Sequence, residues 1–340
     1  MKIKGIISIF LLNYAMLFGS VERSIVPHMD ALILSDLTGK VNQAQMEAMS
    51  EVIPELENKL RIMSFNMLFN LCEAPLAPEN CWINRKVRVP EYIKWSRPDI
   101  IGSQELQSDQ LDNMLPLIRD EYDVFYGIGI DMVGELPPAI FYRRDRIELV
   151  DGSTIRFSDI PEIGVQGSYG DDNNQLVYCH FRDKQTGQEF AVLNTHLSFG
   201  GVDKRYVEAC KLRNFLLTRE NGLPIFITGD FNTFPFRQEL DLPFCDGDQV
   251  VKTIEEGCVV DGMKVALFGH FGPIASTNFC EKTRQTFASP SGQPGIILDH
   301  IFVSEDIAVV AHGIDPATVN HCFPSDHFPV IVDAIVLDRS

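Results

Sequence analysis

Basic residues are few in this chain of 340 residues, in which 29 Lys and Arg stand against 47 Asp and Glu. The formal net charge is −18, and no stretch rich in Lys or Arg stands out. A surface this acidic repels nucleic acid and anionic lipid unless a cation intervenes. Taken alone, the charge indicates no more than good solubility.

Long apolar runs are also missing, apart from one at the N-terminus. There, Lys2 and Lys4 precede a mostly apolar run over 6–18, and the small residues Gly19 and Ser20 follow it. The run is too short to span a bilayer comfortably. We therefore expect a cleaved secretory leader over residues 1–20 rather than a signal anchor. The mature protein would be secreted or periplasmic, with no stable insertion in a membrane.

Several signatures of other chemistry are absent. The eight cysteines show no Cys-x-x-Cys spacing, no His-Glu-x-x-His offers a zinc helix, and no Gly-x-Ser-x-Gly offers a serine nucleophile. An even number of cysteines in an exported chain permits disulfides. Two pairs have separations typical of hairpins, namely Cys72 with Cys81 and Cys245 with Cys258. Cys179 and Cys210 lie in a strand-like and a helix-like run, which favours buried free thiols.

Apolar periodicity predicts one α/β domain over residues 59–340, preceded by an acidic extension over 21–58. We expect strands over 60–67, 100–104, 122–126, 139–142, 147–157, 175–181, 190–195, 223–228, 296–303 and 329–337. We expect helices over 87–95, 111–118 and 203–216, the last capped by Asp203. Residues 236–295 are rich in Gly, Pro and Cys, so long loops over the active face are expected there.

Polar clusters stand at the ends of the apolar runs. They are Ser64-Phe65-Asn66, Ser103-Gln104-Glu105, Asn194-Thr195-His196, Gly229-Asp230-Phe231-Asn232, Leu298-Asp299-His300 and Ser325-Asp326-His327. Each cluster alone is equally typical of a turn. Together they supply oxygen ligands for a hard divalent cation, two imidazoles, and a carboxylate to orient one of them.

This ordered set resembles the endonuclease/exonuclease/phosphatase superfamily from about Leu60 to Leu337. The superfamily comprises metal-dependent phosphoesterases that include deoxyribonucleases, abasic-site endonucleases, sphingomyelinases and inositol-polyphosphate phosphatases. Two further stretches, over 140–146 and 181–184, look like a bacterial subgroup of metal-dependent hydrolases. The resemblance implies a four-layer α/β/β/α sandwich, in which two packed mixed β-sheets are flanked by helices. The active site would lie at one end of the sheets.

The resemblance also implies a metal site. Mg²⁺, with Mn²⁺ as an alternative, would be held by Glu105, Asn66 and Asp326. His327 matches the catalytic His, and Asp299 matches the carboxylate that orients it. The general base is not assigned, because either Asp230 or His327 is suited to accept the proton of the attacking water.

The remaining roles concern the phosphate. Asp230 and Asn232 match the pair that positions the water and a phosphate oxygen, and His196 matches a second, phosphate-binding His. Glu135 matches a partner that orients His196. Many relatives carry an Arg where this chain has Asn174. Arg205 is a candidate to replace that charge, but its position is equally typical of an ordinary surface residue of a helix.

The predicted function is Mg²⁺-dependent hydrolysis of a phosphodiester or phosphomonoester by in-line attack of water. The substrate would be a small molecule, a lipid head group or a nucleic acid, and the protein is expected to be a monomer. The alternative is a non-catalytic secreted binding module that keeps the fold for its surface. A module of that kind would be expected to lose at least one of the site residues.

Overall fold

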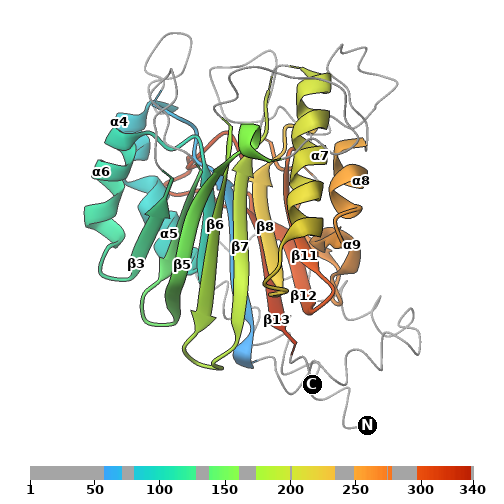
Figure 1. Ribbon diagram of the computed structural model, residues 1–340. Coiled ribbons are helices and arrows are strands. Elements are labelled where there is room, and N and C mark those ends of the chain that lie inside the picture. The colour runs from blue at the N-terminus through green and yellow to red at the C-terminus, as the bar shows by residue number, and fades with distance from the viewer. Residues whose placement is uncertain are drawn as a thin grey trace, which may run out of the picture. The chain divides into compact units, whose positions relative to one another are not determined.

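Two mixed β-sheets with helices on their outer faces form the fold (Figure 1). This computed structural model describes residues 57–70, 80–127, 138–160, 174–199, 201–233, 249–273, 275–277 and 297–337, all within the unit Glu55–Ser340. The expected leader, nearly all of the acidic extension and Glu135 lie outside the described residues. The predicted four-layer α/β/β/α sandwich is confirmed.

Helices separate some of the strands along the chain, and the described part of the chain ends with four strands in succession. The seven-stranded sheet consists, from edge to edge, of β10 (His270–Phe271), β12 (Ile307–Ile314), β13 (Val330–Val336), β1 (Leu60–Asn66), β2 (Ile100–Gln104), β4 (Ala139–Arg143) and β3 (Tyr122–Tyr126). The six-stranded sheet consists of β5 (Ile147–Arg156), β6 (Gln175–Asp183), β7 (Glu189–His196), β8 (Ile225–Asp230), β11 (Asp299–Ser304) and β9 (Val259–Asp261). The helices are α4 (Trp82–Arg85), α5 (Arg88–Ser96), α6 (Ser108–Ile118), α7 (Val202–Thr218), α8 (Gln249–Glu255) and α9 (Gly262–Val265), with a 3₁₀ turn at Phe157–Asp159.

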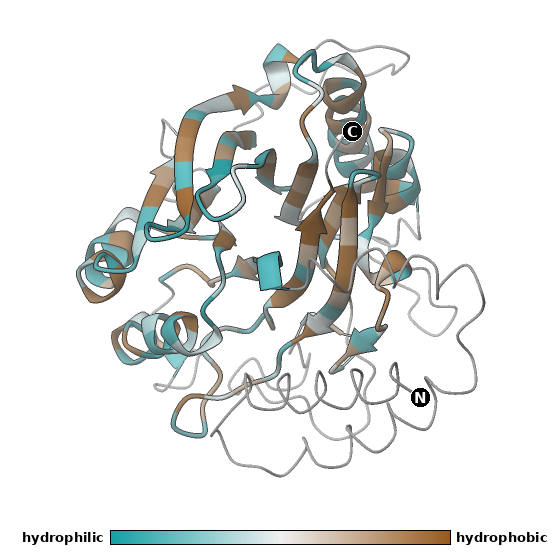
Figure 2. Ribbon diagram, turned by 90° about the horizontal axis from the view of Figure 1, so that it is seen from below, coloured by the Kyte–Doolittle hydropathy of each residue, from teal (hydrophilic) through white to brown (hydrophobic). Residues whose placement is uncertain are grey.

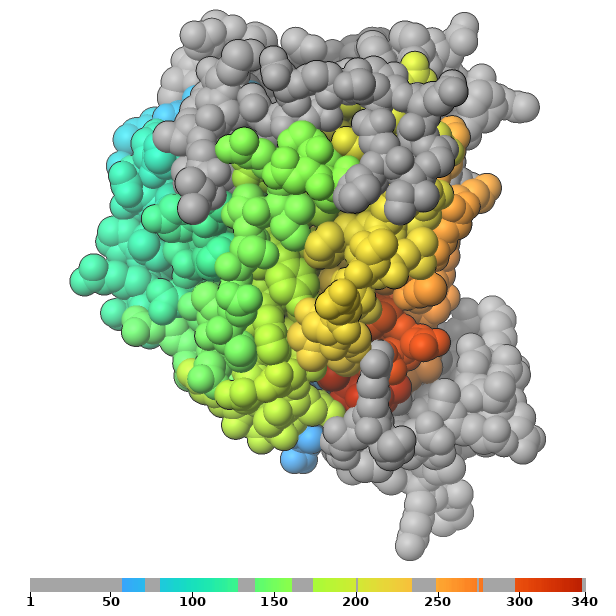
Figure 3. Space-filling model, viewed as in Figure 1, coloured from blue at the N-terminus to red at the C-terminus, as the bar shows by residue number. Residues whose placement is uncertain are grey.

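Three apolar layers hold the sandwich together. Because side chains alternate along a strand, Ile62 of β1 faces the layer between the sheets, whereas Met63 faces the layer under α5 and α6. In the same way, Phe226 of β8 points between the sheets and Ile227 points toward α7 and α8. Strands buried on both faces read as near-continuous apolar runs, and Figure 2 shows them largely in brown. The edge strand β5 has an exposed side, which forms part of the green surface in Figure 3.

Strand direction brings the polar clusters to one end of the sandwich. Strands β1 and β2 are parallel, so Asn66 lies beside Gln104. Strands β7 and β8 are also parallel, so His196 lies beside Asp230, and the antiparallel β11 places Asp299 opposite Asp230. The sheets approach closely beneath this end, because a Cβ on Gly102 would clash with Thr228 Oγ1 of the opposite sheet.

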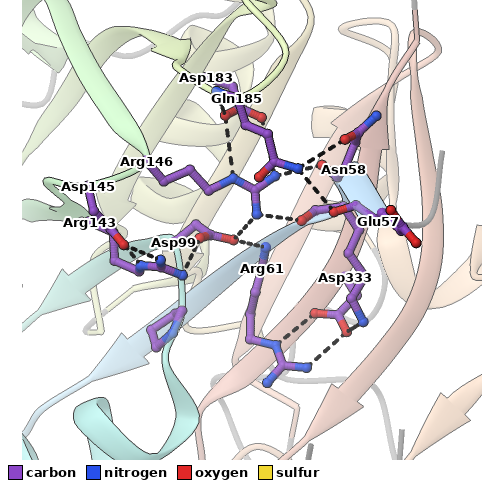
Figure 4. Close-up of polar contacts among 12 residues, drawn as sticks. Glu57, Asn58, Arg61, Asp99, Arg143, Asp145, Arg146, Asp183, Gln185 and Asp333 are labelled. Carbon is purple, nitrogen blue, oxygen red and sulfur yellow. Dashed lines mark hydrogen bonds and ion pairs between the residues drawn. The ribbon is translucent and has the colours of Figure 1, made fainter. Parts of the chain in front are cut away.

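The opposite end of the sheets is closed by ion pairs (Figure 4). Buried Asp99, just before β2, accepts from Arg143 Nη1 at 3.0 Å and from Arg146 Nη1 at 3.3 Å. Arg146 also reaches Asp183 at the end of β6, with Nη2 and Oδ2 3.2 Å apart. On β13, Asp333 accepts from Arg61 Nε at 2.8 Å and from Lys59 Nζ at 3.1 Å. We call these residues the closed-end network.

Two expectations about secondary structure are wrong, and one long strand was missed. The described part of 236–295 is not continuous loop, because it contains α8, β9, α9 and β10. The reason is that Val250, Val251 and Ile254 lie at helical spacing and are buried, despite the Gly and Pro around them. Helix α7 is not capped by Asp203, because it begins at Val202 after Gly201, whose φ is 134°. Strand β12 was not predicted at all.

One other expectation is met within the described residues. Cys179 and Cys210 are buried thiols, as predicted. In the part of the chain that the structure describes, no helix is long and apolar enough to cross a membrane.

Candidate active site

Asp299 and His327 form a pair at the end of the sandwich. Asp299 opens β11, and its Oδ2 lies 2.8 Å from Nδ1 of His327, which stands in the loop before β13. This contact turns Nε2 of the imidazole toward Asp230, whose Oδ2 is 3.8 Å away. Burial alone would lower the pKa of His327, but the Asp299 carboxylate, aided by Asp230 and Asp326, outweighs it and raises that pKa well above its usual range.

Asp230 and Asn232 meet His196 on the other side of the site. Asp230 ends β8, and its Oδ1 accepts from the backbone N–H of Asn232 at 2.9 Å, a turn that gives Asn232 a φ of 49°. The Asn232 side-chain amide donates to Leu197 O at 2.8 Å and lies 3.1 Å from His196 Nε2. The same His196 nitrogen is 3.6 Å from Asp230 Oδ2. The predicted phosphate-side residues are therefore together, while Glu135 lies outside the described residues.

Asn66 and Glu105 come from the ends of β1 and β2. The Asn66 NH₂ group donates to Glu105 Oε1 and to Asp230 Oδ2, both at 2.9 Å. Its amide oxygen accepts from the backbone N–H of Leu68 at 3.0 Å. Asn66 thus contacts the site through its NH₂ group, and its role as a metal ligand stays a prediction.

Asp326 reaches the same region from the C-terminal part of the chain. Ser325 Oγ donates to the backbone oxygen of Asn66 at 2.7 Å and lies 3.2 Å from Asp326 Oδ1. This links the last motif of the chain to the first. Burial raises the pKa of Glu105; the His196 charge opposes that rise, and the Asp326 carboxylate adds to it. Glu105 and Asp326 are therefore close enough to act on one another.

The donor set fits a hard divalent cation. Two groups of side chains could each offer ligand atoms to one ion. The first group is Glu105, His196 and Asp230, and the second is Asp230, Asp299 and His327. Within each group, the candidate ligand atoms all lie within 4.8 Å of one another. Asp326 is in neither group. Asp299 Oδ1 is buried without a hydrogen-bond partner among the described residues. Oxygen-rich, negatively charged sites of this kind suit Mg²⁺ or Mn²⁺.

Neither Asn174 nor Arg205 acts as a free phosphate clamp in this structure. Asn174 Nδ2 donates to Ser198 Oγ at 2.9 Å and to Glu208 Oε1 at 2.8 Å. Arg205 is fully buried and donates through Nη1 to the backbone oxygens of Ser198 and Phe199. The surface reading of Arg205 is therefore wrong, and the side chain supports the turn that follows His196.

Ser276 is a support that sequence reasoning missed. Its Oγ accepts from the backbone N–H groups of Leu298 and Asp299 at 2.9 and 3.1 Å. Its backbone oxygen accepts from Phe328 N at 2.7 Å, and Thr277 forms a bridge with His327. The segment therefore holds both members of the Asp299–His327 pair. The sequence gives no signal for this role, since the partners are backbone groups.

Comparisons with known proteins agree with this geometry. A protein of the endonuclease/exonuclease/phosphatase family from Bacteroides vulgatus is 27% identical, with a TM-score of 0.66 over 82% of this chain and 99% of its own. A mannosyl-6-phosphatase from Bacteroides thetaiotaomicron is 26% identical, with a TM-score of 0.63 over 81% of this chain and 99% of its own. The catalytic domain of human nocturnin, 20% identical with a TM-score of 0.58 over 82% and 94%, shares the fold.

A search of the curated proteins found no match. The family model described as "Endonuclease/Exonuclease/phosphatase family" matches residues 63–327, which contain every described site residue named above. The chain therefore belongs to this family of phosphoester hydrolases, whose enzymes depend on divalent metal ions.

Proposed function

We propose that this protein is a Mg²⁺-dependent phosphoesterase in which Asp299, His327 and Asp230 carry the acid–base chemistry. The observation that supports this most directly is the Asp299–His327–Asp230 arrangement, with contacts of 2.8 and 3.8 Å. It is accompanied by the Asn66–Glu105 contact at 2.9 Å. A binding module would have no use for a buried imidazole held between two carboxylates.

The side chains divide the work as follows. Asp299 accepts a hydrogen bond from Nδ1–H of His327, so the free Nε2 faces the water and its imidazolium form is stabilised. Asp230 and the His327 Nε2 orient that water for in-line attack, and one of the two takes its proton. Asn232 and His196 hold a phosphate oxygen.

Glu105 and Asp326, with Asn66 beside them, would hold the cation. A divalent cation held there would supply the positive charge needed to polarise a phosphoryl oxygen and to stabilise the negative charge that develops on it. The positive charge of the cation would also favour binding of an anionic substrate, which an acidic protein otherwise repels.

The test is a hydrolysis screen with and without Mg²⁺. The substrates are bis-p-nitrophenyl phosphate, plasmid DNA, sphingomyelin, inositol phosphates and mannose 6-phosphate, the last because of the likeness to the mannosyl-6-phosphatase. We expect release of phosphate or alcohol from at least one of them, lost with EDTA and in His327→Ala. No turnover of any substrate by a folded, metal-binding protein would favour the non-catalytic binding module.

We further propose that residues 1–20 are a cleaved leader, that residues 21–58 are an N-terminal extension, and that the catalytic domain spans 59–340. Support for the leader comes from Lys2, Lys4 and the apolar run that follows them. N-terminal sequencing of protein from the native host should begin near Ser20 or Val21. An intact Met1 on protein found in the cytoplasm would overturn this proposal.

A further inference from the structure

Arg85, the last residue of α4, is a fully buried cation close to the site. Its guanidinium donates to backbone oxygens, and no carboxylate of the described residues is among its hydrogen-bond partners. The partners are Asn80 O (2.7 Å from Nε), Met67 O and Pro324 O (2.7 and 3.2 Å from Nη1), and Leu68 O and Phe69 O (2.8 and 3.2 Å from Nη2).

These oxygens belong to segments that carry the predicted metal ligands. Residues 67–69 directly follow Asn66, and the backbone N–H of Phe69 points at Glu105 Oε2, 3.4 Å away. Pro324 stands two residues before Asp326. One guanidinium therefore joins the loop beside Glu105 to the loop that presents Asp326, although these loops are far apart in sequence.

The guanidinium is itself fixed in place. The ring of Trp82, three residues earlier in α4, lies under it, with 5.3 Å from the guanidinium carbon to the ring centroid. Burial lowers the pKa of Arg85 to about 10, while the charges of Asp326 and Glu105 oppose that fall. Arg85 is thus a buried cation near enough to be influenced by both carboxylates, and its hydrogen bonds go to backbone oxygens rather than to them.

We propose that Arg85 is a positioning residue of the metal site. Its hydrogen bonds set the separation of Glu105 and Asp326, and so set the affinity of the site for a divalent cation. This inference rests on the proposed function, because it assigns both carboxylates to the metal. Groups that orient metal ligands without touching the metal commonly change its affinity by 10- to 100-fold when they are replaced.

Arg85→Lys is the sharpest variant. Lysine keeps the charge, but its three donors sit on one atom and cannot span the separated oxygens of residues 67–69 and 324. The matched control is Arg146→Lys in the closed-end network, since Arg146 also donates to two backbone oxygens, those of Asn58 and Lys59. Both substitutions should lower the melting temperature, and only one should affect the metal.

The measurement is isothermal titration calorimetry of the full chain with MnCl₂ alone. We expect Arg85→Lys to weaken Mn²⁺ binding by about tenfold or more, and Arg146→Lys to leave it unchanged. Hydrolysis by Arg85→Lys should recover at high Mn²⁺, because the catalytic pair is intact. An Arg85→Lys protein that is less stable but binds Mn²⁺ as tightly as wild type would overturn the proposal.

If Arg85→Lys does not fold, Trp82→Leu decides the question, because it keeps the guanidinium and removes the ring beneath it. Weaker Mn²⁺ binding is the expected result, and unchanged binding would contradict the positioning role. Wild-type protein that binds no Mn²⁺ at all would instead overturn the metal-dependent function itself. The two failures are thus distinguishable.

Discussion

The two ends of the sandwich both bury carboxylates, but they neutralise them differently. At the closed end, Asp99, Asp183 and Asp333 are each bonded to an arginine. At the site end, the four carboxylates Glu105, Asp230, Asp299 and Asp326 form no ion pair with Lys or Arg among the described residues. Of these four, Asp230 lies within ion-pair distance of His196 and His327, and Asp299 lies within ion-pair distance of His327.

This difference separates stability from function. A buried carboxylate is costly unless a charge or several hydrogen bonds compensate it. The closed end supplies that compensation permanently, from side chains of its own strands. The site end supplies imidazoles, which can titrate, and side-chain amides, which cannot. The hydrogen bonds of Arg85 there go to backbone oxygens and not to the carboxylates. A site of this kind remains receptive to an exchangeable cation, which is what phosphoester hydrolysis with a metal requires.

The largest effect is expected at the closed end. Arg61→Met removes the 2.8 Å arginine partner of buried Asp333, while Lys59 stays 3.1 Å from it. Removing one partner of a buried pair typically costs about 3 kcal/mol or more, to be measured as a lower free energy of unfolding in urea. The turnover of the folded enzyme should not change. A loss of activity without a loss of stability would break the division between the two ends.

Asp299→Asn should show the reverse pattern. Folding and Mn²⁺ binding should be nearly normal, while kcat falls by roughly 10²-fold, which corresponds to about 2.7 kcal/mol. The pKa of His327 is raised by Asp299, so the acidic limb of the pH–rate profile should move to lower pH in the variant.

His327→Ala is the partner variant for this test. The double variant should be little worse than His327→Ala alone, because the two residues act as one unit. Additive losses in kcat would mean that Asp299 and His327 work separately.

The sequence predicted the layers, and it marked polar residues that the structure brings together, because both leave a pattern in the sequence. Apolar runs marked strands such as β1 and β8, and polar residues at their ends marked Asn66 and Asp230. The order of the motifs, through the resemblance to the family, then suggested roles for residues to which spacing alone assigned none. Short elements such as α8 were missed, since a seven-residue helix among glycines and prolines gives a weak periodic signal.

The supporting residues could not be predicted in the same way. Arg85 and Ser276 act on backbone groups, which every sequence possesses, so no complementary residue type marks their partners. The orientation of the Asn66 amide depends on the backbone N–H of Leu68, in a left-handed turn with a φ of 53°. Contacts of this kind arise only once the chain has folded.

Metal removal is expected to act on the site end alone. With Mn²⁺ at 100 times its Kd, the wild-type protein should gain about 2.7 kcal/mol in free energy of unfolding. Glu105→Gln keeps the shape of the side chain but removes its charge, so most of this gain should vanish, and excess metal should restore activity only in part. Without metal, the variant should be at least as stable as wild type, because a half-buried negative charge near Asp326 is gone. An undiminished Mn²⁺ effect in Glu105→Gln would remove this residue from the metal site.

The smallest effect concerns the pH dependence of the closed end. Although burial alone would raise it, the pKa of Asp333 is lowered from 3.8 to about 2 by Arg61 and Lys59. The folded protein therefore holds this carboxylate ionised where the unfolded chain begins to protonate it. The resulting stability, about 2 kcal/mol, is present above pH 4 and is lost as the pH falls toward 2. In Asp333→Asn this contribution is missing at every pH. The difference in free energy of unfolding between wild type and variant should shrink as the pH falls from 4 to 2.

Asp145 provides the control, since it also bonds to an arginine, at 3.0 and 2.6 Å, but its side chain is 64% exposed. Solvent screens such a pair, so Asp145→Asn should produce a much smaller pH-dependent difference. The free energies of unfolding are measured in urea at each pH. If the difference from wild type changed equally with pH in the two variants, burial would not strengthen the closed-end network.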